Sequence, residues 1–268
     1  MSRFDLESKL SPQIIAKETL RDCDINEFPV DLKMVNNKLG IYFQEDRLNN
    51  SEEGCAFKND GKYGILINNT IKNNERKKFT IAHEIGHIQL KHLKDIKKIS
   101  CFSEDIENYK TNKLKEAEAN EFASELILPS DEIVKLIKKN NINFNLIEKA
   151  SDFYGSSFTA AAVKIVKLSD LPCILVMSKN KKVEWAIASQ DLKFKYDVPR
   201  GYLSDITLAM ELFNNESMMK LEDEIEAIEW LDDGDNSVDE LDYIKEHSVY
   251  YPNYNRVLTL LVFPDIAY

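Results

Sequence analysis

The stretch KKFTIAHEIGHIQLKH, residues 77–92, most strongly constrains what this chain can fold into, because it places two histidines four positions apart around a glutamate. In a helix, residues i and i+4 lie about 40° apart around the axis, so His83 and His87 point the same way. Two imidazoles in this arrangement can bind one zinc ion. Glu84 is rotated by about 100° from His83. From there it could take a proton from a water molecule beside the metal.

The other positions of this stretch give the helix two faces. Ile81, Ile85 and Ile88 form a stripe opposite the histidines, which predicts that this side is buried and that the histidine side faces a cleft. Gly86 removes a side chain next to the histidine face, where we expect a substrate or a strand to approach. The five-residue pattern also arises by chance in amphipathic helices, so a third ligand is needed.

The segment LKEAEANEFASELILP, residues 114–129, supplies a candidate third ligand. On a helix, Glu116 shares its side with Asn120 and with an apolar face. The remaining glutamates of the segment fall on the opposite side and are predicted to form a solvated stripe: Glu118, Glu121 and Glu125. A buried carboxylate needs a partner, and a metal supplies one. We therefore predict Glu116 as the third ligand, with Asn120 bonding a ligand histidine. A carboxylate that only favours the start of a helix is the alternative.

His92 does not have the spacing of a third ligand, because the long metzincin pattern needs a histidine six residues after the second one. We interpret His92 as a solvent-facing residue at the helix end, where its charged form would suit the C-terminal dipole. No residue stands out for stabilising an oxyanion, and Tyr109 and His92 are the candidates.

Composition and charge narrow the classes of protein. The 268 residues are 43% hydrophobic and 30% charged, as in globular proteins. A net charge of −11 argues against direct nucleic acid binding, because phosphates would be repelled. The longest apolar runs, such as LTLLVF, fall far short of the roughly 20 residues of a membrane helix, and the N-terminus shows no apolar signal core. Four scattered cysteines suit free thiols in a reducing cytosol, so we expect a cytoplasmic protein without a membrane segment.

Local patterns predict an α+β fold. Helices are expected over residues 11–23, 29–40, 74–92, 113–127, 130–140 and, as a pair, 143–168. Strands are expected over residues 41–44, 54–58 and 62–68 as a short antiparallel sheet, over 173–189 as a hairpin and over 256–264. Residues 93–112 are predicted to be irregular, and the acidic residues 221–246 to form a solvated helix and loop.

Taken together, His83, Glu84, His87 and Glu116 form a set of the gluzincin type. The segments RKKFTIAHEIGH and EAEANEFASELILP resemble the ImmA/IrrE family of metallopeptidases. In that family, Arg-x-x-Phe-Thr-x-Ala-His-Glu-x-x-His is followed by Glu-x-x-Ala-Asn-x-Phe-Ala and a Leu-x-x-Pro ending. PVDLKMVNNKLGIYF and GILINN also resemble the start of the family, so the likeness covers roughly residues 28–168. After about residue 170 the chain resembles the small GAF-like sensor domain of longer members.

The resemblance implies three parts. Residues 1–128 would form a minimal gluzincin-like zinc-peptidase domain, with a small antiparallel sheet and helices. Residues 129–169 would form a helical segment, similar to a helix-turn-helix but used for packing. Residues 170–268 would form a C-terminal α/β sensor-like domain.

The resemblance also implies a function: a zinc-dependent, site-specific endopeptidase. Its substrate would be a helix-turn-helix repressor of a mobile element or stress regulon, encoded nearby, which cleavage would inactivate. His83, His87 and Glu116 would hold Zn²⁺, and Glu84 would activate the water. The strand at GILINN could pair with an extended substrate segment. The alternative is a zinc-stabilised regulator that binds and sequesters the repressor without cutting it, and such a module has no need of Glu84 as a base.

Overall fold

A computed structural model of the chain describes residues 10–49, 51–102, 114–192, 197–215, 217–232 and 243–264. The chain divides into two compact units: unit 1 is Met1–Pro129 with Ser151–Ser157, and unit 2 is Ser130–Ala150 with Phe158–Tyr268. Each unit combines helices with its own sheet, which confirms the α+β class. The three-part division drawn from the sequence stays a prediction. Among the described residues, no helix has both the length and the apolar character needed to cross a membrane.

The elements of unit 1 are α1 (Pro12–Asp22), α2 (Leu32–Lys38), β1 (Tyr42–Asp46), β2 (Glu52–Asn59), β3 (Lys62–Asn68), α3 (Asn74–Gln89), β4 (Lys98–Phe102) and α5 (Leu114–Ile127). The strands form one sheet in the order β1-β3-β2-β4. β2 pairs antiparallel with β3 and with β4, but β1 pairs parallel with β3. The prediction of a purely antiparallel sheet is therefore wrong, because β3 returns beside β1 after the hairpin.

Two further sequence predictions about this sheet are wrong. β4 falls in a stretch that was predicted to be irregular, and pairing with β2 makes it a strand in the absence of a strong local pattern. β3, which contains the GILINN segment, lies between β1 and β2. Both of its edges are therefore hydrogen-bonded, and it cannot also pair with a substrate. The outer strands of this sheet are β1 and β4.

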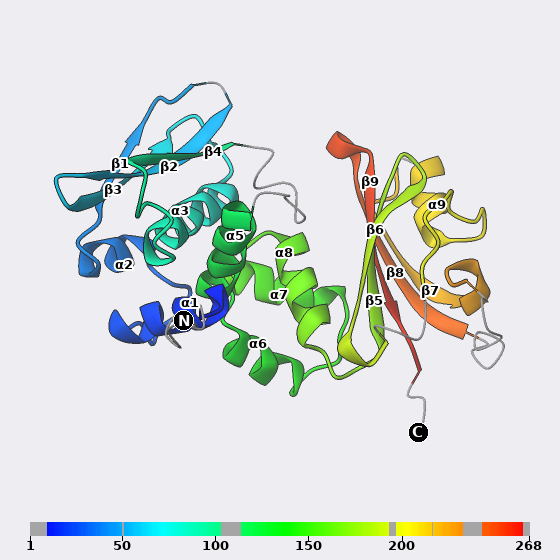
Figure 1. Cartoon of the computed structure of the whole chain (residues 1–268). Helices are drawn as coiled ribbons and strands as arrows, with labels where there is room; N and C mark the ends of the chain where they lie inside the picture. Colours follow the sequence, from blue (N-terminus) through cyan, green and yellow to red (C-terminus); the bar gives the residue numbers. More distant parts are fainter. Residues whose placement is uncertain are drawn as a thin grey trace, which may run out of the picture. The chain divides into compact units, whose positions relative to one another are not determined.

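The helix α3 is buried almost all around its circumference. It begins at Asn73, whose side-chain oxygen accepts the backbone N–H of Arg76 at 2.8 Å. One side of α3 packs on the sheet and another packs on α5 (Figure 1). A Cβ atom at Gly86 would lie 3.0 Å from Cδ1 of Phe122 and 3.3 Å from the carbonyl oxygen of Ala119. Gly86 thus permits the close approach of α5, and not of the substrate or strand that the sequence suggested.

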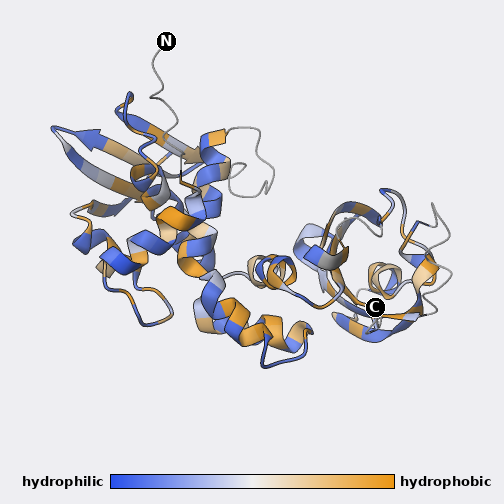
Figure 2. Ribbon diagram, turned by 60° about the horizontal axis from the view of Figure 1, so that its bottom comes forward, coloured by the Kyte–Doolittle hydropathy of each residue, from blue (hydrophilic) through white to orange (hydrophobic). Residues whose placement is uncertain are grey.

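The elements of unit 2 are α6 (Ser130–Ile137), α7 (Phe144–Tyr154, whose last turn belongs to unit 1), α8 (Phe158–Leu168), β5 (Cys173–Lys179), β6 (Lys182–Ala188), α9 (Leu208–Asn214), β7 (Lys220–Glu226), β8 (Tyr243–Tyr251) and β9 (Arg256–Val262). Its antiparallel sheet has the order β6-β5-β9-β8-β7. α8 lies on one face of the sheet and α9 on the other (Figure 1). Hydrophobic and hydrophilic residues are mixed along the elements of both units (Figure 2). Each unit has buried apolar side chains of its own, such as Ile85 and Phe122 in unit 1 and Leu212 and Trp230 in unit 2.

The described residues of the acidic stretch 221–246 form strands and a short 3₁₀ turn (Ala227–Glu229), where a helix was expected. In β7, Ile225 is buried while Glu224 and Glu226 on either side are exposed, which is the pattern of a strand with one solvent-exposed face. β7 is an outer strand of its sheet and pairs with β8. High charge at a sheet edge discourages pairing with other chains, so the acidic residues fit this position.

We predict that Gly86→Val destabilises the protein by about 1–3 kcal/mol, because the added side chain overpacks the contact of α3 with the fully buried Phe122. The urea midpoint of the metal-free protein measures the effect. Gly201→Val is the matched control, since a Cβ atom there meets nothing within 4 Å. Equal midpoints for the two variants would contradict the role assigned to Gly86.

Candidate metal site

The three predicted ligands meet where α3 packs on α5. The Nε2 atoms of His83 and His87 lie 2.9 Å apart. The Oε2 atom of Glu116 lies 3.1 Å from Nε2 of His83 and 3.4 Å from Nε2 of His87. Both histidines are fully buried, and Glu116 is 6% exposed. These residues form a buried group that is able to hold a metal ion.

The protonation of this group suits a cation. Nδ1–H of His83 donates to Oδ1 of Asn120 at 2.8 Å, the contact predicted for that asparagine, so a neutral His83 ring turns the lone pair of Nε2 toward the group. Burial lowers the pKa of His87 to about 4, which keeps its ring neutral near pH 7. Burial raises the pKa of Glu116, but contacts with the two rings outweigh this and lower it below its ordinary value. Two neutral nitrogens and one anionic oxygen are the donor set of a catalytic zinc site.

Glu84 lies beside this set and not in it. Its side chain is fully buried, and among the described residues no side chain donates a hydrogen bond to its carboxylate; the backbone N–H of Ala56 faces it and opposes the rise of its pKa. Burial, and then the charge of Glu116, raise the pKa of Glu84. Its carboxylate lies within 4.8 Å of a ring nitrogen of His83 and of Sγ of Cys101. A buried carboxylate without a side-chain partner is costly, and such a group in a folded protein calls for a functional explanation.

An ion pair brings β2 against Glu84. Nε of Arg76, in the first turn of α3, donates to Oε1 and Oε2 of Glu53 at 2.6 and 2.9 Å. The hydroxyl of Thr80 donates to the carbonyl oxygen of Arg76 at 2.9 Å and lies 3.4 Å from Oε2 of Glu53. β2 is bulged at this point. The next residue, Gly54, is so close that a Cβ atom there would lie 3.0 Å from Oε1 of Glu84.

The interpretation of His92 as a solvent-facing residue is wrong, because it is only 5% exposed. After the end of α3, Lys91 has a φ of 58°, and the backbone N–H of His92 donates to the carbonyl oxygen of His87 at 3.0 Å. This C-terminal turn folds the chain back and places His92 over His87. Nδ1 of His92 lies 2.9 Å from Nδ1 of His87, and Nε2 lies 2.9 Å from Oε2 of Glu118. A glycine directly after α3 would have predicted this turn from the sequence, but the chain has Lys91 at that position.

The predicted stripe of solvated glutamates on α5 is also wrong in part. Glu121 is exposed, as expected. Glu118 contacts His92, and Glu125 is fully buried with Nζ of Lys17 at 4.0 Å. The prediction failed because α5 is covered on more than one side. Tyr109, the other oxyanion candidate, lies outside the described residues.

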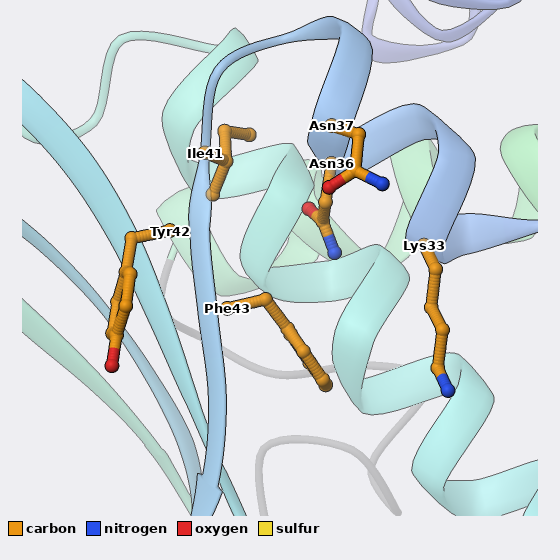
Figure 3. Close-up of a pocket in the computed structure, with 6 residues that line it drawn as sticks. All are labelled: Lys33, Asn36, Asn37, Ile41, Tyr42 and Phe43. Carbon is orange, nitrogen blue, oxygen red and sulfur yellow. The ribbon is translucent and has the colours of Figure 1, made fainter.

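A cavity of about 360 Å³ lies in unit 1 between α2 and β1 (Figure 3). Its lining consists of Lys33, Asn36, Asn37, Ile41, Tyr42 and Phe43. None of these is a predicted site residue. Among the described residues, the amide atoms of Asn36 have no hydrogen-bond partner. The lining includes none of the three residues of the candidate metal site, so the cavity is separate from that site.

Comparisons with known proteins agree with this geometry. Residues 36–166 match the Peptidase M78 family, described as the IrrE N-terminal-like domain, which confirms the resemblance seen in the sequence. No curated protein matches the chain. Among solved structures, a Mycobacterium tuberculosis transcriptional regulator is similar, with a TM-score of 0.59 and 11% sequence identity over 94% of this chain and 76% of that one. At this identity the likeness shows a shared fold.

We predict that the purified protein carries about one divalent metal ion per chain, because three protein ligands converge on one point. Glu116→Gln should lose most of this metal, since it removes the anionic ligand. Elemental analysis of the purified proteins measures both. Glu121→Gln, the same change at an exposed position of the same helix, is the control and should keep its metal. A Glu116→Gln variant with the metal content of the wild type would remove this residue from the ligand set.

Proposed function

We propose, from the fact that this chain belongs to the ImmA/IrrE family over residues 36–166, that it is a zinc-dependent, site-specific endopeptidase. His83, His87 and Glu116 would hold the ion. Zinc in such a site polarises the scissile carbonyl group and makes a neighbouring water molecule more acidic. The protein itself orients the ligands through contacts such as that of Asn120 with His83.

The state of Glu84 carries this proposal. A metal site that only holds structure has no use for a buried carboxylate that lies outside the group of His83, His87 and Glu116 and that, among the described residues, no side chain bonds. Burial raises the pKa of Glu84, and a raised pKa makes a carboxylate a stronger base. Beside a zinc ion, Glu84 would accept a proton from the attacking water and deliver it to the leaving amine.

We propose that the substrate reaches the site past β4, and not by pairing with β3. β4 is an outer strand of its sheet and pairs with β2. Its residue Cys101 lies within 4.8 Å of both His83 and Glu84, so this strand passes the site.

The proposed substrate is a helix-turn-helix repressor of a mobile element or stress regulon, in the cytoplasm. The net charge of −11 favours a protein partner over a nucleic acid. We propose that unit 2 contains a GAF-like sensor, supported by its separate core around Trp230 and Leu261. The pair α7 and α8 would serve as packing and not as a DNA reader, since most of α8 is buried within unit 2.

One observation favours the alternative function, a zinc-stabilised regulator that sequesters its repressor without cutting. His83, Glu84 and His87 are all fully buried, and structural zinc sites are typically closed. A peptidase would have to open this site to its substrate. The two functions differ in whether Glu84 is needed.

We predict that Glu84→Gln lowers the rate of repressor cleavage by about 10²- to 10⁴-fold, because it keeps the shape of the side chain and removes the base. The variant should keep its metal, since Glu84 is not a ligand, and should co-purify with the uncut repressor from its native host. Cleavage is measured as the rate at which repressor fragments appear under inducing conditions.

Glu121→Gln is the matched control for this experiment and should cleave like the wild type. If Glu84→Gln relieves repression as well as the wild type while the repressor stays intact, cleavage is not the mechanism, and sequestration takes its place. If Glu84→Gln loses its metal, the separation of base and ligands is wrong.

A further inference from the structure

A chain of hydrogen-bonding groups extends behind His87, on the side of the ring away from the other ligands. Nδ1 of His87 lies 2.9 Å from Nδ1 of His92, and Nε2 of His92 lies 2.9 Å from Oε2 of Glu118. The side chain of His92 is 3% exposed and that of Glu118 is 15% exposed. The contacts are therefore shielded from water, where hydrogen bonds have the strongest orienting effect.

Only one arrangement of protons satisfies this chain when both rings are neutral. Oε2 of a charged Glu118 only accepts, so Nε2 of His92 must carry a hydrogen. Nδ1 of His92 is then the acceptor, and Nδ1–H of His87 donates to it. His87 is left with a lone pair on Nε2, the atom 2.9 Å from Nε2 of His83. The reverse arrangement would set a lone pair of His92 against the carboxylate.

We propose that His92 and Glu118 are positioning residues for the metal ligand His87, an inference that rests on the metal-binding part of the proposed function. Glu118 holds His92 in one tautomer, and His92 in turn holds His87 in the tautomer and orientation that present Nε2 to the metal. The negative charge of Glu118 also stabilises the positive charge that the His87 ring gains when it binds a cation.

The surrounding structure holds His92 in this place from two sides. The turn after α3 fixes its backbone through the bond from its N–H to the carbonyl oxygen of His87. Nζ of Lys115, in the first turn of α5, donates to the carbonyl oxygen of His92 at 3.1 Å. His92 is thus tied to both helices that supply the ligands.

The helix α5 then serves the metal site at three alternate positions. Glu116 is the ligand, Glu118 acts on His87 through His92, and Asn120 accepts from Nδ1–H of His83. Each ligand histidine is therefore linked to one residue of α5 behind its ring, His83 directly and His87 through His92. A shift of α5 relative to α3 would disturb all three contacts at once.

The zinc affinity of the full chain, measured by competition with a chelator, tests the proposal. Glu118→Gln keeps the shape and removes the charge, and His92→Phe keeps a flat ring and removes both nitrogens. Each should weaken zinc binding by about 10- to 100-fold. Glu121→Gln, which removes the same charge from an exposed position of the same helix, should bind zinc like the wild type. The double variant His92→Phe/Glu118→Gln should bind no more weakly than His92→Phe, since Glu118 acts through His92.

Long-range ¹H–¹⁵N spectra of the histidine rings supply a readout that does not depend on how the variants fold. In the zinc-loaded wild type, His87 should be the Nδ1–H tautomer and His92 the Nε2–H tautomer. A His92 ring protonated on Nδ1 alone would overturn the proposal.

The binding results separate this proposal from the proposed function. If Glu118→Gln and His92→Phe bind zinc as tightly as the wild type does, the positioning role is overturned and the proposed peptidase function is unaffected. A wild type that binds no zinc would overturn the metal site itself, and the positioning role with it.

Discussion

The structure of unit 1 depends on one constraint: the side chains of His83, His87 and Glu116 bring three electron-pair donors together in the protein interior. The Nε2 atoms of His83 and His87 are 2.9 Å apart, and Oε2 of Glu116 is close to both. Without a proton or a cation between them these atoms repel one another, and burial removes the water that would otherwise separate them. A metal ion held by the three residues would replace this repulsion with attraction between α3 and α5. Metal binding and the packing of these helices are therefore coupled, so that metal would stabilise the fold as well as the site.

Close packing makes this convergence possible. Gly86 lets the backbone of α5 approach α3, and Phe122 fills the space beside it. The pair of Arg76 with Glu53 fixes the other side of α3 to β2, which explains why the sequence motif begins several residues before the first histidine. Within this tightly bonded region, no side chain among the described residues donates a hydrogen bond to Glu84. This contrast with the well-supported ligands is the reason to propose a catalytic role for it.

Features that depend on local spacing can be predicted from the sequence. Features that depend on contacts between distant segments cannot. The separation of His83 and His87 and the helical position of Glu116 are local, so the three ligands could be named in advance. The turn at Asp60-Gly61 is local as well, because an Asp-Gly pair favours the positive φ that both residues adopt. By contrast, β4 owes its extended form to β2, and β1 pairs parallel with a strand that follows a hairpin. The burial of His92 depends on a lysine in a left-handed conformation, which no local pattern announces. Glu118 has the local pattern of a surface residue, because its partner His92 comes from a distant part of the sequence.

The burial of the site limits how a substrate could reach it. Glu84 has α3 behind it, Gly54 of β2 against one oxygen, and Cys101 of β4 nearby. β2 is held on both sides, by β3 and by β4, and is tied to α3 through Glu53 and Arg76. α5 cannot move away without disturbing the ligand Glu116 and the contacts to both histidines. Among these neighbours, only β4 is an outer strand that supplies none of the three predicted metal ligands. A movement of β4 would therefore expose Glu84 at the smallest cost to the metal site. This reconciles a fully buried base with hydrolysis of a peptide bond.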